Sequence, residues 1–262
     1  MWSIDECTQF FVAAIEAEDR RLRDEQAVHG LDALDEVSLH AILAREIESS
    51  GLGVLREQPY PTTWKKRPRA KGDEADIPLP RERERCDLVL TPKPGLVIAD
   101  EVRTRQRVKA VRAEAQETLF QASAERLIAS GELRGAEASS PPGSERTISA
   151  SDAMWIEVKA LGQFEHVDGV PVPNRTYASR LMRSVAGDVA KLAGDRMIVH
   201  AGVLVTLFAA DRATAEHDLL IVAHRCLDRD LPISTPAMAV VPIQERIGNS
   251  VCVAAVFPVK RT

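Results

Sequence analysis

The sequence predicts an α/β protein, with a mixed central sheet flanked by helices. Stretches with apolar residues at helical spacing open the chain and recur beyond residue 176, and short apolar runs typical of strands lie between them. The run 201–210 is apolar almost throughout, which indicates a central strand covered on both faces. Strands that alternate with helices in this way form one sheet with helices packed against it.

Two amphipathic helices are expected before the first strand, at about 3–27 and 31–50, and each is followed by a glycine that can end it. A chain of 262 residues suits one large domain that carries an insertion. We therefore treat 1–30 as an N-terminal helix and 31–262 as the main domain.

Glu46 lies on or beside the buried stripe of the second helix. It follows the apolar residues Ile42 and Leu43 by four and three positions, which are the spacings of neighbours on a helix surface. Its carboxylate therefore either faces the interior or reaches water from the edge of the stripe.

Three strands should follow the second helix, at 52–64, 85–91 and 96–102. A Pro-rich, charged loop over 65–85 separates the first two, and its basic start would suit a phosphate backbone, although solvated loop charges are common. Asp87 lies in the second strand beside an apolar run.

The segment 103–150 is expected to be an insertion before the next strand. Residues 108–128 have a helical pattern, whereas 130–151 are rich in Gly, Ser and Pro. Small polar residues have little surface to bury, so we expect limited proteolysis to cut first within 130–151.

The strand at 152–161 carries charges on one of its faces. Side chains alternate along a strand, so Glu157 and Lys159 point to the same side as Trp155, while Ile156 and Val158 point to the other side and enter the core. Charged groups on an otherwise buried strand are costly unless they have partners or a function.

The remainder alternates helices with strands. A loop is expected at 162–175, helices at 176–192 and 211–227, and strands at 237–243 and 251–259. Leu181 and Val185 mark the buried side of the first of these helices, with Asp188 placed off that side.

The composition excludes several classes of protein. The four cysteines are scattered without a CxxC pair, which favours neither a zinc site nor disulfides and leads us to expect a cytoplasmic protein. No run approaches the roughly 20 apolar residues that cross a bilayer, so we expect no membrane partner. The sequence also lacks GxSxG, P-loop and GxGxxG motifs, which removes support for serine hydrolases and nucleotide-binding folds.

Asp87 together with Glu157-Val158-Lys159 resembles the PD-(D/E)xK nuclease superfamily, which has the restriction-endonuclease-like fold. The superfamily shows a helix, a three-strand meander with acidic residues, and then a helix and a strand, and the resemblance covers about 31–227. The chain departs from the family because 70 positions separate Asp87 from Glu157, whereas these strands are commonly joined more directly. We attribute the distance to the insertion; otherwise Asp100 takes the place of Asp87.

The resemblance implies a metal-dependent nuclease that hydrolyses phosphodiester bonds. We expect DNA as its main substrate and a role in restriction, defence or repair. Asp87, Glu157 and the backbone carbonyl of Val158 would hold Mg²⁺, with Mn²⁺ as a substitute. Glu46 matches the place of a helix glutamate that often helps to bind the metal. The catalytic residues would be Asp87, Glu157 and Lys159, with the lysine orienting or deprotonating the attacking water and stabilising developing charge.

Gln163, Arg180 and Lys191 are further candidates for substrate binding, since polar residues at such places contact the scissile phosphate in parts of the superfamily. Ordinary surface positions are the alternative explanation for all three. The alternative function is a non-catalytic protein that binds nucleic acid or a partner with the same fold, which the net charge of −5 favours. Nucleic acid is the expected partner, and a homodimer or a partner protein is a further option.

Overall fold

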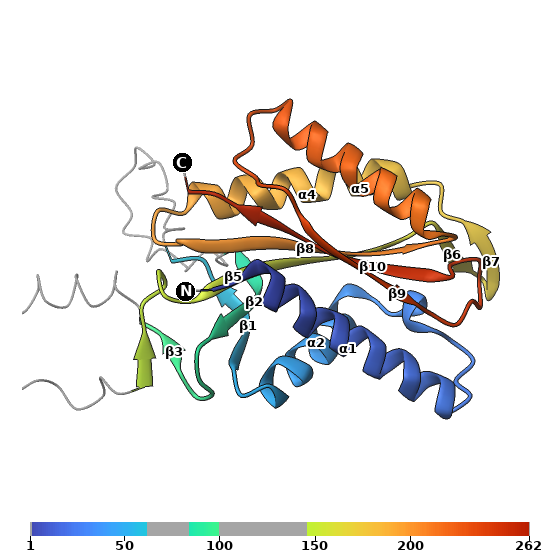
Figure 1. Cartoon of the computed structure of the whole chain (residues 1–262), viewed down its shortest axis with the longest axis horizontal. Helices are drawn as coiled ribbons and strands as arrows, with labels where there is room; N and C mark the ends of the chain where they lie inside the picture. Colours follow the sequence, from blue (N-terminus) through green and yellow to red (C-terminus); the bar gives the residue numbers. More distant parts are fainter. Residues whose placement is uncertain (1, 62–83, 100–145, 262) are drawn as a thin grey trace, which may run out of the picture.

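The structure is a computed structural model that describes residues 2–61, 84–99 and 146–261. Its centre is a six-stranded sheet (Figure 1), whose strands lie in the order β1 (Gly53–Pro59), β2 (Arg85–Thr91), β5 (Met154–Gly162), β8 (His200–Ala209), β10 (Val251–Val259) and β9 (Ala237–Pro242). β5 and β8 are parallel and the other neighbouring pairs are antiparallel, so the sheet is mixed.

Helices cover both faces of the sheet in the described part of the chain (Figure 1), with α1 (Ile4–Asp24) and α2 (Glu36–Ser49) on one face and α4 (Tyr177–Gly194) and α5 (Arg212–Leu227) on the other. A 3₁₀ turn at Leu31–Ala33 precedes α2. The predicted α/β class, a mixed central sheet flanked by helices, is confirmed.

Alternate residues of β5 enter the two opposite cores, as the period of two predicts. Trp155 packs on the α4/α5 side, and Ile156 and Val158 pack on the α1/α2 side. β8 is buried from Ala201 to its end, because helices cover both of its faces. The central-strand assignment of 201–210 is therefore confirmed.

α1 packs on the sheet as part of the main core. Phe11 and Ile15 are fully buried in the cluster that also holds residues of α2, β5 and β10. Ser3 begins the helix and accepts a hydrogen bond from the backbone N–H of Glu6. None of the helices in the described ranges is long and apolar enough to cross a bilayer.

Four expected elements differ from the structure. The helix expected at 31–50 begins at Glu36 as α2, and the strand expected at 52–64 ends at Pro59 as β1. The strand expected at 96–102 is the short β3 (Val97–Ile98), which pairs in parallel with β4 (Thr147–Ile148) outside the central sheet. The loop expected at 162–175 instead contains a hairpin of β6 (Phe164–Val167) and β7 (Val170–Pro173).

The hairpin forms despite its prolines because β7 belongs to a two-stranded sheet, whose outer edge requires no N–H donor. Asp168 and Gly169 form its turn with φ of 52° and 79°, the pair of positive values that a two-residue hairpin turn favours.

Several predictions fall on residues 62–83 or 100–145, outside the described ranges. These are Asp100, most of the charged loop over 65–85, and nearly all of the segment 103–150, including most of the expected cleavage region. The described end of that segment contains β4 and the buried Ala150.

Candidate metal centre and active site

The candidate site lies where β2 and β5 diverge. The two strands pair from Leu90 with Met154 to Leu88 with Ile156, and both then continue beyond this pairing. Asp87 directly precedes Leu88 on β2, and its carboxylate accepts a hydrogen bond of 2.7 Å from the backbone N–H of Val158. The side chain thus replaces a ladder hydrogen bond and is fixed against β5.

β1 is distorted directly opposite Asp87. Glu57 has a φ of 53°, in the left-handed region that only a small share of residues other than glycine adopt. Its neighbours Arg56 and Gln58 pair regularly with Leu88 and Cys86. Such a conformation costs about 1–3 kcal/mol, and outliers of this kind concentrate at functional sites.

Lys159 lies among carboxylates from three different elements. Its Nζ lies 3.1 Å from Glu36 Oε1 on α2, 3.2 Å from Asp188 Oδ2 on α4 and 3.8 Å from Asp87 Oδ2 on β2. It also donates to the carbonyl of Val158 at 2.7 Å. Burial alone lowers the pKa of Lys159, but these carboxylates raise it more, so the pKa lies above its ordinary value and the ammonium is charged at neutral pH.

Glu157 is almost fully buried and accepts a hydrogen bond from the hydroxyl of Tyr60. The ring of Tyr60 stacks on Trp155, with centroids 6.1 Å apart, so the donor is held in place by packing. Burial, and then the charges of Asp87 and Asp188, raise the pKa of Glu157 to about 8. A nearby cation would favour the ionised carboxylate instead.

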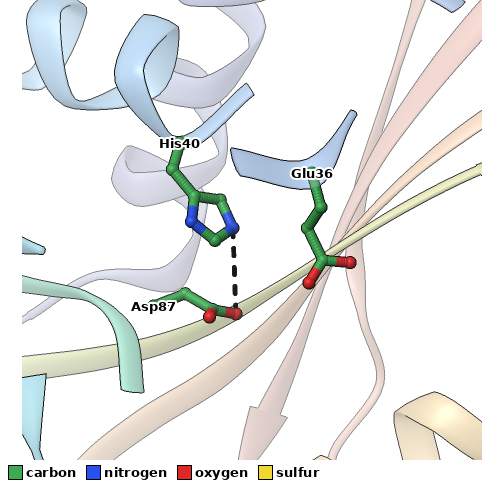
Figure 2. A group of neighbouring side chains, drawn as sticks. All are labelled: Glu36, His40 and Asp87. Carbon is green, nitrogen blue, oxygen red and sulfur yellow. Dashed lines mark ion pairs between the residues drawn. The ribbon is translucent and has the colours of Figure 1, made fainter. Parts of the chain in front are cut away.

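Glu36 and His40 extend from the first turns of α2 toward Asp87 (Figure 2). Ligand atoms of these three residues all lie within 4.8 Å of one another, and His40 Nε2 lies 3.9 Å from Asp87 Oδ2. They are a glutamate, a histidine and an aspartate, which together offer oxygen and nitrogen ligands to a divalent ion.

His40 is buried without a hydrogen bond to either ring nitrogen in the described part of the chain. Its Nδ1 lies 3.8 Å from Glu57 Oε1, and Nε2 is the atom nearest Asp87. Burial lowers the pKa of His40 although the nearby carboxylates of Asp87 and Glu36 oppose the shift, so the neutral imidazole is favoured. A neutral imidazole with two orphaned nitrogens beside carboxylates fits a metal ion.

The structure brings Asp87, Glu157 and Lys159 together, with Val158 between them bound through both its backbone N–H and its carbonyl. Glu46 lies elsewhere, because it follows Glu36 on α2 by ten residues, which is about 15 Å along the helix axis. Glu36 is the α2 glutamate that contacts the cluster.

The three expected substrate-binding residues have different surroundings. Gln163 accepts a hydrogen bond of 3.0 Å from the backbone N–H of Ala210, so it joins the ends of β5 and β8. Arg180 is exposed on α4. Lys191 donates to Asp188 at 2.8 Å and thereby reaches the cluster.

Asp188 is buried, which corrects its expected place off the buried side of its helix. It follows Leu181 and Val185 by seven and three residues and precedes Leu192 by four, so it lies on the apolar stripe of α4. The sequence therefore contained a signal for this residue, namely a carboxylate on the apolar stripe of a helix.

Sequence reasoning also missed Glu36, His40 and Tyr60. The first two have the spacing of four residues that places side chains on one helix face, a signal that was present in the sequence. Nothing local distinguishes Tyr60, whose role depends on β5.

Comparison of the chain with protein-family models, with curated protein sequences and with solved structures finds no match.

Proposed function

We propose that the chain is a metal-dependent nuclease of the PD-(D/E)xK type that hydrolyses phosphodiester bonds, in the first place those of DNA. The observation that carries the proposal is the convergence of Asp87, Glu157 and Lys159 with Glu36 and His40 at one point of the sheet. The order of elements supports it as well. A helix (α2) and an antiparallel meander (β1, β2, β5) are followed by a helix (α4) and a parallel strand (β8).

The metal would be held by Asp87, Glu36 and His40. Glu157, whose carboxyl interacts with that of Asp87, would add negative charge beside the metal. When bound there, a divalent cation would supply Lewis-acid activation of the phosphate and would lower the pKa of a bound water. Mg²⁺ prefers oxygen ligands, whereas the imidazole of His40 suits first-row transition ions, so Mn²⁺ should support activity better than Mg²⁺.

Lys159 would stabilise the negative charge that develops on the phosphate. Its raised pKa keeps it protonated, which suits an electrostatic role and not that of a general base. The backbone N–H of Val158 fixes Asp87, and Tyr60 fixes Glu157, so that both carboxylates are held before substrate arrives.

A second candidate function is a non-catalytic nucleic-acid- or partner-binding protein. It is favoured by the charge balance inside the cluster, where Lys159 already has ion pairs to Glu36, Asp87 and Asp188. A lysine neutralised in this way can serve a purely structural network.

The test is cleavage of supercoiled plasmid, single-stranded DNA and RNA in Mn²⁺, Mg²⁺ or EDTA, together with Mn²⁺ binding by calorimetry. Asp87→Asn should abolish cleavage and weaken Mn²⁺ binding, because it removes a ligand. Lys159→Ala should lower the cleavage rate by about 10²-fold or more and leave Mn²⁺ bound, because the carboxylates remain.

Glu46→Gln is the matched control for both measurements, since Glu46 is a helix carboxylate away from the cluster. It should behave as the wild type. Metal-dependent cleavage that is equal in the wild type and Lys159→Ala would contradict the role of the lysine. A wild type that binds DNA without cutting it in any metal would establish the second function.

A further inference from the structure

Asp188 is a buried carboxylate on a helix stripe that is otherwise apolar. Its exposed fraction is 4%, and Val185, Val189 and Leu192 around it on α4 are buried in the core. A buried charge is costly, and an apolar side chain at such a position is often at least as stable. Because the burial of this carboxylate is costly, we expect Asp188 to act on the groups that it contacts.

Its two carboxylate oxygens hold two different ammonium groups. Oδ1 accepts a hydrogen bond of 2.8 Å from Lys191, one turn later on α4, and Oδ2 lies 3.2 Å from the Nζ of Lys159 on β5. Oδ2 has this ion pair but no hydrogen bond among the described residues, so it retains an acceptor site beside the cluster.

The two lysines differ in their access to solvent. The side chain of Lys159 is 16% exposed and that of Lys191 is 43% exposed. A continuous series of ion pairs runs from the surface to the candidate metal centre. It links Lys191 to Asp188, Asp188 to Lys159, and Lys159 to Asp87.

We propose that Asp188 is a positioning residue that holds Lys159 and Lys191 as a pair of ammonium groups for the phosphate backbone of the substrate. Lys191 contacts a phosphate from the solvent side, and Lys159 contacts the phosphate at the metal centre. Ammonium groups at a fixed separation select a ligand with successive anionic groups, which is the chemistry of a polynucleotide. This inference rests on the proposed nuclease function.

The experiment compares Asp188→Asn, Lys191→Ala and their double variant with Arg183→Ala. Arg183 is an exposed cation on the same helix, so its removal matches the charge change of Lys191→Ala. Steady-state cleavage in Mn²⁺ gives kcat and KM. Anisotropy of a fluorescein-labelled DNA duplex in Ca²⁺ gives the dependence of binding on salt concentration.

Lys191→Ala should raise KM, leave kcat near the wild-type value and reduce the slope of log affinity against log salt by about 0.9, the share of one phosphate contact. Arg183→Ala should keep both KM and that slope. Asp188→Asn should lower kcat by about 10²-fold, because Lys159 loses its support, and should reduce the salt slope as Lys191→Ala does.

The double variant should bind DNA with the salt slope of Asp188→Asn alone, because the first change already releases Lys191. If Asp188 had no positioning role, Asp188→Asn would only remove a negative charge. DNA binding would then be tighter, and kcat would be unchanged or higher. That result would overturn the inference.

Two further results separate this inference from the proposed function. A wild type that cleaves DNA, with Lys191→Ala equal to Arg183→Ala in salt slope, overturns the inference alone. This comparison requires no stable Asp188 variant, because Lys191 lies at the surface. A wild type that neither binds nor cleaves nucleic acid overturns both.

Discussion

At the scale of single residues, the candidate site concentrates acidic groups that oppose folding. Glu157 and Asp188 are both buried, and Asp87 is held close to Glu157 by its bond to Val158. Like charges in a buried place disfavour ionisation, and the two lysines, Lys159 and Lys191, do not neutralise the four carboxylates of Glu36, Asp87, Glu157 and Asp188. Such an arrangement is typical of functional sites, which lower the folding stability of the protein in exchange for the ability to bind a cation or substrate.

Glu157→Gln should stabilise the metal-free protein at alkaline pH. The pKa of Glu157 is about 8 in the folded chain against the ordinary 4.5, so the folded state holds the proton more tightly. Its contribution to stability is complete below about pH 4.5 and is lost as the pH rises through 8. The glutamine lacks this loss, and the gain should reach a few kcal/mol at about 1.4 kcal/mol per pKa unit.

Thermal unfolding between pH 5 and pH 9 measures this effect, with EDTA present. The difference between the variant and the wild type should be smallest near pH 5, grow as the pH rises to about 8, and level off above that. Mn²⁺ should raise the melting temperature of the wild type more than that of the variant. Equal pH profiles in the two proteins would show that the Glu157 carboxyl is not perturbed.

At the scale of elements, local geometry sets how closely neighbouring segments approach. Gly53 begins β1, where an added Cβ would overlap the side-chain oxygen of Thr91 and the backbone carbonyl of Lys93. Gly187 lies in α4, where an added Cβ would have no neighbour within 4 Å. The same substitution at these two places should therefore have opposite effects.

Gly53→Ala should destabilise the protein by about 1–3 kcal/mol, because the β1 start and the turn after β2 must move apart. Gly187→Ala should stabilise it by about 0.5–1 kcal/mol, because alanine loses less backbone entropy in a helix than glycine does. Urea unfolding of the two variants beside the wild type gives both values. Changes of the same sign would contradict the packing around β1 or the open surface of α4.

At the scale of the whole molecule, the sheet brings together residues that are far apart in the chain. α2 lies on one face of the sheet and α4 on the other (Figure 1). Both helices contact Lys159, near the point where β2 and β5 diverge. Central strands that pair on both sides, such as β5 and β8, form the stable part of such a fold.

Hydrogen exchange should detect metal binding as protection at three separate segments. Mn²⁺ at about 100 times its Kd adds about 2.7 kcal/mol, so local opening that breaks the site should become about 100-fold rarer. We expect slower exchange at 36–40, 85–88 and 157–160. β9, at the far edge of the sheet, should be unchanged. Protection limited to one segment would mean that the three do not form one site.

The sequence by itself determined the features that depend on local pattern. The period of two in β5 placed Trp155 and Val158 on opposite faces, and the continuous apolar run identified β8 as a buried central strand. These features are readable because side-chain direction in a strand repeats every two residues. The grouping of Asp87 with Glu157 and Lys159 came from the family resemblance.

Only the tertiary structure decided which residues complete the cluster. Glu36, and not Glu46, lies at the cluster, since the first turns of α2 approach the diverging ends of β2 and β5. The tertiary structure also added His40 and Asp188, whose helices meet Lys159 from opposite faces of the sheet. Helical periodicity states which side of a helix is buried, but the neighbour across the interface depends on how the layers pack.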